Sequence, residues 1–139
     1  MKYAIALDIG GTNVKYALID QMGNIVFESL KAVKSDNVQS SLLDKLKEII
    51  HELLDFAESK GLEVIGIGIG VPSVVDEGVV LFANNLLELN DKNLSVLLSA
   101  FHLPVYVEND ANMMGLGEAT YGSAKGLTDV VFLTIGTGI

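Results

Sequence analysis

The sequence predicts an α/β domain with a mixed β-sheet, in which the first three strands form an antiparallel meander. Two observations lead to this fold class. The first 32 residues contain three β-type runs joined by tight turns, and from about Asn37 onward helical and β-type periodicities alternate. Short turns join antiparallel neighbours, whereas alternating strands and helices favour parallel pairing.

Composition and charge limit the function classes. The 139 residues include 50% hydrophobic side chains, no Cys, and a formal net charge of −9. The apolar content excludes a disordered chain, and the acidic balance argues against a nucleic-acid partner, which would require a basic surface. Without Cys there is neither a disulfide framework nor a thiolate metal site. The length fits one domain, residues 1–139.

Both ends of the chain carry information. Asp8 interrupts the apolar segment that starts at Met1 before a secretory signal core could form, and no apolar run is long enough to span a membrane. We therefore expect a cytoplasmic protein with no membrane partner. The run Asp129–Ile135 resembles a buried strand that leads into glycine-rich residues 136–138. We expect this chain to be the N-terminal half of a longer protein, with its C-terminal domain absent.

The first elements follow from periodicity and turn residues. The meander strands are expected at Tyr3–Ile9, Val14–Ile19 and Ile25–Ala32. A helix should follow from about Asn37, with Gly61 at its C-terminus. Its apolar face consists of Val38, Leu42, Leu46, Ile49, Ile50, Leu53 and Ala57.

The next strand, Val64–Val71, has one apolar face and one glycine face. Its isoleucines alternate with Gly66, Gly68 and Gly70, so one side is bare backbone that a helix or ligand can approach closely. Pro72 ends the strand. The remaining expected elements are a hairpin over Val74–Phe82, a helix over Leu94–Phe101, a strand over Val105–Glu108, a helix over Ala111–Tyr121 that Gly122 ends, and the strand Asp129–Ile135.

Two glycine-rich turns are candidate phosphate sites. In the turn that contains Asp8, Gly10, Gly11 and Thr12, the backbone N–H groups and a hydroxyl could bind an anion, and a carboxylate could bind Mg²⁺. A hairpin turn that needs glycine only for a positive φ is an equally good explanation of this segment alone. The turn at residues 136–138 has the same chemistry. No P-loop pattern occurs.

The pair Asn109–Asp110 lies between a strand and a helix. An ionised carboxylate at a helix N-terminus can accept a proton from an attacking hydroxyl, and the adjacent amide can bind sugar hydroxyls. Without further context, a helix N-cap is the favoured role of Asp110. Asn84–Asn85 is either a plain turn or a pair of amides that face a sugar. We expect His51, His102, Met113 and Met114 to be ordinary packing or surface residues.

Four motifs, in order and spacing, resemble the N-terminal half of the ROK family (repressor, open reading frame, kinase). They are Asp8 to Lys15, Gly66 to Pro72, Val107 to Asn112, and Leu133 to Gly138. The resemblance covers essentially the whole chain. It implies a ribonuclease H-like fold of the actin-like ATPase type, in which two such domains close on ATP and a sugar.

The resemblance also implies roles for individual residues. Asp110 would be the general base that takes the proton of the attacking sugar hydroxyl. Asn109 and Asn85 would bind the sugar, and Asp8 would place Mg²⁺. The implied nucleotide-binding residues are Asp8, Gly10, Gly11, Thr12, Asn13, Thr134, Gly136, Thr137 and Gly138. The substrate would be a hexose or N-acetylhexosamine, and the complete protein would be a homodimer.

The chain departs from the family pattern at one position. The family usually has Pro-Gly where this chain has Pro72-Ser73. Ser73 could add a hydroxyl contact to the sugar or crowd its C2 substituent, so the identity of the sugar stays open. The structural zinc of the family belongs to the C-terminal half, as do its remaining sugar-binding residues and its adenine pocket.

The leading hypothesis is therefore an ATP-dependent sugar kinase whose isolated N-terminal half is nearly inactive. A sugar-sensing repressor of the same family is the chief alternative, although the first strand begins near Tyr3 and leaves no room here for a preceding helix-turn-helix. A catalytically silent sugar-binding protein is another alternative. A ribonuclease H-type nuclease using Asp8, Glu108 and Asp110 is disfavoured by the charge of −9.

Overall fold

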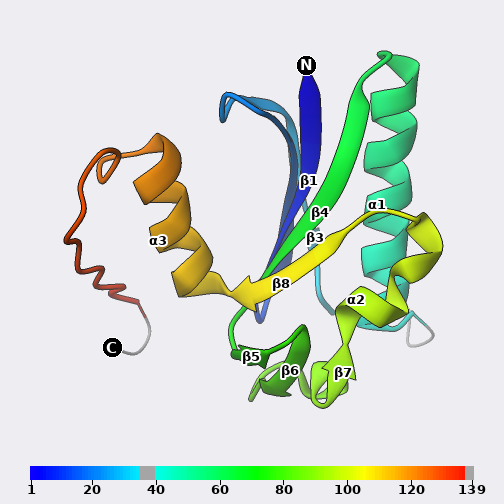
Figure 1. Cartoon of the computed structure of the whole chain (residues 1–139). Coiled ribbons are helices and arrows are strands. Elements are labelled where there is room, and N and C mark those ends of the chain that lie inside the picture. Colours follow the sequence, from blue (N-terminus) through cyan, green and yellow to red (C-terminus); the bar gives the residue numbers. More distant parts are fainter. Residues whose placement is uncertain (35–39, 137–139) are drawn as a thin grey trace.

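The computed structural model describes residues 1–34 and 40–136, in which a five-stranded sheet separates two helices (Figure 1). Helix α1 covers one face of the sheet, and helix α3 stands beyond the other. The strands are β1 (Lys2–Ile9), β2 (Asn13–Asp20), β3 (Ile25–Ala32), β4 (Glu63–Val71), β5 (Val74–Asp76), β6 (Val79–Phe82), β7 (Lys92–Asn93) and β8 (Val105–Asn109). The helices are α1 (Leu42–Ser59), α2 (Leu94–Leu97) and α3 (Asp110–Tyr121), with 3₁₀ turns η1 (Leu87–Leu89) and η2 (Ser99–Phe101).

The sheet topology confirms the predicted mixed sheet. Its strand order is β3-β2-β1-β4-β8. The first three strands pair antiparallel as a meander, and β1, β4 and β8 pair in parallel. The carboxyl ends of these three parallel strands therefore meet at one edge of the sheet, where ligands bind in open α/β folds.

Helix α1 forms the core together with the covered face of the sheet. Ser41 caps its N-terminus by accepting a hydrogen bond from the Asp44 amide at 3.1 Å. At its other end Gly61 has a φ of +66°, and the Leu62 amide donates to the carbonyl of Ala57, which is a Schellman motif. The predicted face residue Val38 lies outside the described residues. In the described part of the chain, no helix is both long enough and apolar enough to cross a bilayer.

A second, small sheet contains β5, β6 and β7. The predicted hairpin is present, and its two central residues, Glu77 and Gly78, both have a positive φ, as in tight hairpin turns. The predicted helix over Leu94–Phe101 is divided into α2 and η2. No residue pattern predicts β7 and η1, because segments of two or three residues have no measurable periodicity.

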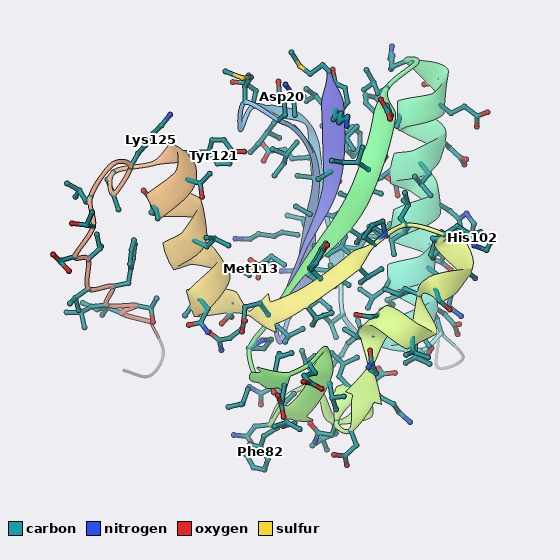
Figure 2. The ribbon with its side chains drawn as sticks, viewed as in Figure 1. Asp20, Phe82, His102, Met113, Tyr121 and Lys125 are labelled. Carbon is teal, nitrogen blue, oxygen red and sulfur yellow. The ribbon has the colours of Figure 1, made fainter. Side chains whose placement is uncertain are left out.

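Helix α3 extends over the face of the sheet opposite α1. It begins at Asp110, one residue earlier than predicted, and ends at Gly122 as expected. Near its C-terminus the Tyr121 hydroxyl donates to the carbonyl of Gln21 at 3.2 Å, so this end lies against the β2–β3 turn (Figure 2). The helix has no buried residues.

The predicted strand at Asp129–Ile135 is wrong, since the structure has no strand there. A β-type run becomes a strand only when a neighbouring strand accepts and donates its backbone hydrogen bonds. No described strand pairs with this segment, and Val131 and Leu133 are 87% and 80% exposed. The apolar residues of this segment predicted burial, but in the described part of the chain Val131 and Leu133 are exposed.

Candidate active site

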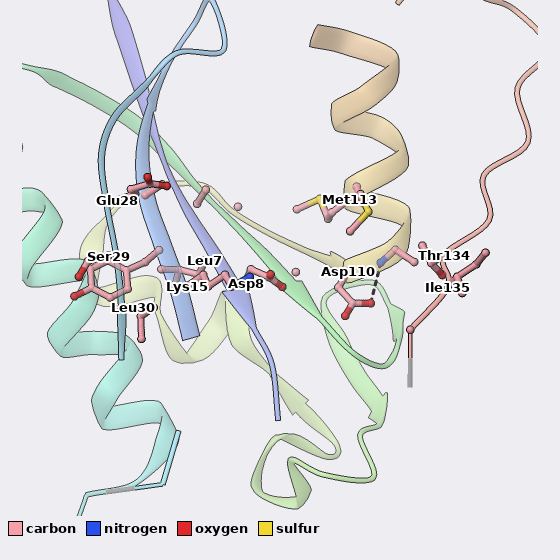
Figure 3. Close-up of a pocket in the computed structure, with 18 residues that line it drawn as sticks. Leu7, Asp8, Lys15, Glu28, Ser29, Leu30, Asp110, Met113, Thr134 and Ile135 are labelled. Atoms are coloured by element: carbon pink, nitrogen blue, oxygen red, sulfur yellow. Dashed lines mark hydrogen bonds between the residues drawn. The ribbon is translucent and has the colours of Figure 1, made fainter. Parts of the chain in front are cut away.

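A cavity of about 1090 Å³ lies between the open face of the sheet and α3 (Figure 3). It is lined by β1, β2, β3 and β4, by the first turns of α3 and by residues 134–136. Asp8 and Lys15 on the sheet and Asp110 on α3 are its charged residues near the carboxyl ends of the parallel strands. Glu28 contributes a further carboxylate from β3.

The floor of this cavity consists of small residues, which let α3 approach. A Cβ added at Gly68 would lie 3.6 Å from the Met113 methyl, and one added at Gly70 would lie 3.5 Å from the Asp110 Cα. Figure 2 shows Met113 projecting from α3 toward the sheet. The predicted close approach to the glycine face of Val64–Val71 is confirmed, and the approaching element is the N-terminal part of α3.

The hydrogen bonds of the β8–α3 turn show whether Asp110 caps the helix, which is one of the two roles that the sequence left open. Asn109, not Asp110, is the N-cap, because its Oδ1 accepts a hydrogen bond from the Asn112 amide at 3.1 Å. Asp110 is the first residue of the helix, and its Oδ1 accepts from the Ala111 amide at 2.8 Å. Since Asn109 already caps the helix, the Asp110 carboxylate is not needed for that purpose and lines the cavity.

Asp8 lies at the end of β1, close to Asp110. The atom Oδ1 of Asp8 and the Cβ of Asp110 are respectively 3.9 and 3.7 Å from the position of a Cβ added at Gly70. Burial raises the pKa of the Asp8 carboxyl above its usual range, the negative charge of Asp110 raises it further, and Lys15 partly opposes both effects. Two neighbouring carboxylates that repel each other fit a divalent cation, and Mg²⁺ typically takes one or two protein carboxylates and completes its shell with water and phosphate oxygens.

The β1–β2 turn has the features of an anion site. Neither Gly10 nor Gly11 has a positive φ, so the need for a left-handed backbone does not explain them. Within residues 1–34 and 40–136, the amides of Gly11 and Thr12 donate no hydrogen bond, and both residues are exposed. A Cβ added at Gly11 would lie 3.6 Å from the Cβ of Asn85. This turn is therefore next to the segment that follows the hairpin.

Ser73 and Asn109 connect the hairpin to the β8–α3 turn. Ser73 is buried, and its Oγ is hydrogen-bonded to the backbone of Phe82. The Asn109 Nδ2 donates to the Ser73 carbonyl at 3.0 Å. Asn85 and Asn84 are exposed.

The other predicted nucleotide residues are distributed as follows. Thr134 and Gly136 line the cavity, whereas Thr137 and Gly138 lie outside the described residues. Asn13 is the first residue of β2, and its carbonyl accepts a hydrogen bond from the Gly10 amide at 2.9 Å.

Lys15 lies at the site although no role was expected for it from the sequence. This residue pairs with Asp8 across the β1–β2 hairpin, and it lines the cavity. The signal was present in the sequence, because a short turn between residues 9 and 14 places residue 15 opposite residue 8.

Two other expectations concern residues near the site. The Glu108 carboxylate accepts hydrogen bonds from the Asn109 amide and the Asn112 side chain, and no group of three or more potential metal ligands was found among the described residues. Asp8, Glu108 and Asp110 therefore do not form such a group. His51 packs edge-on against Phe101, as expected for a packing residue.

Comparisons with known proteins agree with this fold. The family model described as "ROK family" matches residues 4–139. The chain is 32% identical over 137 residues to the xylose repressor of Caldicellulosiruptor bescii, covering 97% of this chain and 34% of the repressor. It is 30% identical over 141 residues to the glucokinase of Streptomyces coelicolor, covering 100% of this chain and 42% of that enzyme. The chain thus spans less than half the length of these relatives.

A solved structure shows the same fold. The ROK glucokinase of Streptomyces griseus, in complex with glucose and AMPPNP, superposes with a TM-score of 0.67 at 29% identity, covering 89% of this chain and 38% of that enzyme. The ribonuclease H-like, actin-like ATPase fold that the motifs implied is therefore confirmed. The chain belongs to the ROK family.

Proposed function

We propose that this chain is the N-terminal domain of an ATP-dependent sugar kinase, which transfers the γ-phosphate of ATP to a hydroxyl of a hexose or N-acetylhexosamine. The observation that carries the proposal is the position of Asp110. Its carboxylate lines a cavity at the carboxyl ends of parallel strands, close to Asp8, while Asn109 caps the helix. The glucokinase relatives support a sugar kinase.

In this proposal Asp110 is the general base. A carboxylate near the attacking sugar hydroxyl accepts its proton as the oxygen bonds to the γ-phosphorus and the bond from that phosphorus to ADP breaks. Asp110 is the first residue of α3, so its carboxylate lies at the N-terminal end of the helix and borders the cavity.

The nucleotide phosphates would bind at the β1–β2 turn. The free amides of Gly11 and Thr12 and the Thr12 hydroxyl are donors for phosphate oxygens, and Gly10 and Asn13 shape the turn. Thr134 and the glycine-rich residues 136–138 would contribute the second phosphate loop. Asp8 would hold Mg²⁺, which neutralises charge on the transferred phosphate.

The sugar would bind beside Asn109 and Asn85. In Asn109, Oδ1 accepts one hydrogen bond and Nδ2 donates one, so each atom retains capacity for a further hydrogen bond to a sugar hydroxyl. Asn85 is exposed next to Gly11, between the expected phosphate and sugar positions. The relatives are two to three times longer than this chain, and a second domain would supply the rest of both pockets.

A sugar-responsive repressor is the second candidate. The observation that favours it is the match to xylose repressors, which is as strong in identity as the match to glucokinases. A repressor would bind a sugar at the same site without transferring phosphate. Phosphate transfer to a sugar therefore separates the two candidates.

The test is ADP release by the complete protein with ATP and Mg²⁺ across glucose, fructose, mannose, allose, N-acetylglucosamine and N-acetylmannosamine. We expect turnover with at least one sugar, and loss of that turnover in Asp110→Asn. Sugar binding without turnover in the wild-type protein would contradict the kinase proposal and favour the repressor.

A further inference from the structure

Ser73 is one of three buried polar or charged residues in the described part of the chain, together with Asp20 and Lys45. It follows β4 and Pro72 and precedes β5, so it lies where the main sheet gives way to the small one. Ser73 is 5% exposed. A buried hydroxyl must find hydrogen-bond partners inside the protein, and those partners indicate what it does.

The Ser73 hydroxyl is bonded to both backbone groups of one residue on the opposite strand. Its Oγ accepts from the Phe82 amide at 3.0 Å and donates to the Phe82 carbonyl at 2.6 Å. The β5–β6 register shifts at this point, since Val74 pairs with Phe82 while Val75 pairs with Val80. The hydroxyl therefore fixes the end of β6 beyond an irregularity in the ladder.

The Ser73 backbone makes the second connection. Its carbonyl accepts a hydrogen bond from the Asn109 Nδ2 at 3.0 Å, and the Oδ1 of the same amide caps α3. One residue thus joins the end of the hairpin to the turn that presents Asn109 and Asp110 to the cavity.

The segment that Ser73 holds leads directly to Asn85. After Phe82, the buried Ala83 donates its amide hydrogen to the Asn90 Oδ1 at 2.7 Å. Asn84 and Asn85 follow, exposed, with the Asn85 side chain next to Gly11. The side chains of Ser73 and Asn90 therefore fix residues 82 and 83, which directly precede these two asparagines.

We propose that Ser73 is a positioning residue for the sugar, which holds the Asn84–Asn85 turn in place relative to Asn109 and Asp110. This inference rests on the proposed function, because it assumes that a sugar binds between these residues. The Oγ, with partners inside the hairpin, acts through the backbone of Phe82 rather than by touching the sugar. Loss of the hydroxyl should loosen the Asn85 side of the site and leave the phosphate turn and Asp110 in place.

The experiment compares Ser73→Ala with the wild-type protein in the complete enzyme. We expect the KM for the sugar to rise on the order of tenfold, as for the loss of one or two hydrogen bonds of a buried hydroxyl, while the KM for ATP and kcat at saturating sugar change less than about twofold. Ser73→Thr, which keeps a hydroxyl, should restore most of the sugar affinity.

Ser95→Ala is the matched control. The Ser95 hydroxyl donates to the Val105 carbonyl at 3.1 Å, and Ser95 is a partly buried residue of α2. This variant loses a comparable hydrogen bond and should keep the sugar KM of the wild type. An unchanged sugar KM in Ser73→Ala, or an equal rise in Ser95→Ala, would overturn the proposal.

Two further measurements test the positioning role of Ser73 even if the protein is not a kinase. Amide hydrogen exchange of the ligand-free protein should be faster at Phe82 and Leu86, whose amides donate to the Ser73 Oγ and the Ala83 carbonyl, in Ser73→Ala than in Ser95→Ala, and equal rates would overturn the positioning role. If the wild-type protein shows no turnover, calorimetry of sugar binding tests the inference instead. A sugar Kd about tenfold weaker in Ser73→Ala would then support positioning in a sugar-binding protein that is not a kinase, whereas an equal Kd or no sugar binding by the wild type would overturn it.

Discussion

The two faces of the main sheet are made by alternate residues of the same strands, yet they have opposite character. The covered face is apolar and packs on α1. Its buried residues on β1, β2 and β4 are Ile5, Leu7, Ile9, Val14, Tyr16, Leu18, Ile67, Ile69 and Val71. The open face carries small or charged residues, namely Ala6, Asp8, Lys15, Ala17, Gly68 and Gly70, and borders the cavity.

This difference indicates that stability and chemistry are divided between the faces. Large apolar residues on one side supply the burial that folds the domain. Glycine and alanine on the other side leave room for α3 and for ligands. Substitutions on the two faces should therefore have separable effects, and the following experiments can sharpen or break that separation.

The largest expected effect is on the open face. Asp110→Asn should lower kcat about 10²- to 10⁴-fold, because the amide cannot accept the proton of the sugar hydroxyl. The free energy of unfolding should change by less than about 0.5 kcal/mol, since Asn109 still caps α3. Steady-state assays and urea denaturation measure the two quantities. Unchanged turnover would contradict the role of Asp110 as the base. A large loss of stability would show that Asp110 contributes to folding as well.

The next effect belongs to the covered face. Ile49→Ala should destabilise the domain by about 2–5 kcal/mol, because Ile49 is 0% exposed on the inner face of α1. Turnover per folded molecule should stay near the wild-type value. Glu48→Ala is the control, since this exposed neighbour should cost less than about 0.5 kcal/mol. Equal costs for the two variants would contradict the assigned orientation of α1.

A smaller effect is expected at the turn where the faces meet. Asn109→Ala removes the cap of α3 and should cost about 0.5–2 kcal/mol. Asn109→Ser keeps an oxygen for the Asn112 amide and adds no charge beside Asp110, so it should cost less. Denaturant unfolding of both variants measures this difference, and a Ser variant as unstable as the Ala variant would show that capping is not the stabilising contribution.

The smallest effect is a pH dependence of stability with opposite signs at two aspartates. The pKa of Asp8 is raised in the folded state, mainly by burial and then by Asp110, so ionisation of Asp8 costs stability as the pH rises through and above its usual range. Asp8→Asn should therefore gain stability relative to the wild type between about pH 4 and pH 7.

Asp20 provides the contrast, because hydrogen bonds from Asn24 and Met22 lower its pKa. Its contribution to stability is present above its usual range and is lost as the pH falls. Asp20→Asn should therefore be less stable than the wild type at pH 7, and the difference should shrink toward acid pH. Thermal unfolding between about pH 2 and pH 7 measures both trends, because the Asp20 contribution is lost only below the usual pKa range of a carboxyl group. Slopes of the same sign would contradict the electrostatic account of the two aspartates.

Much of the fold could be predicted because it depends on local periodicity. The meander, the apolar face of α1, and the Gly61 and Gly122 helix ends all follow from residue spacing. The strand predicted at Asp129–Ile135 was wrong for a non-local reason, because a strand needs a pairing partner and none of the described strands pairs with this segment. The site was predicted only in outline. Sequence could place Asn109 and Asp110 at a helix N-terminus, but only the hydrogen bond to Asn112 showed which of them is the cap.

Ser73 is a second residue whose role could not be predicted from the sequence. The departure from the Pro-Gly of the family left open whether Ser73 contacts the sugar or crowds its C2 substituent. Nothing in the sequence indicated that its hydroxyl would be hydrogen-bonded to the backbone of Phe82. That pairing depends on a register shift in a two-strand ladder. Such irregularities arise from packing between elements and leave no periodic signal.

The most direct test of the division between faces is amide hydrogen exchange of the complete protein with and without ATP, Mg²⁺ and the preferred sugar. The account predicts that the ligands slow exchange in peptides covering residues 8–13, 70–73, 83–86 and 108–113, at the open-face edge of the sheet, with no change in α1. Protection in α1, or none at the β1–β2 and β8–α3 turns despite measured binding, would contradict it.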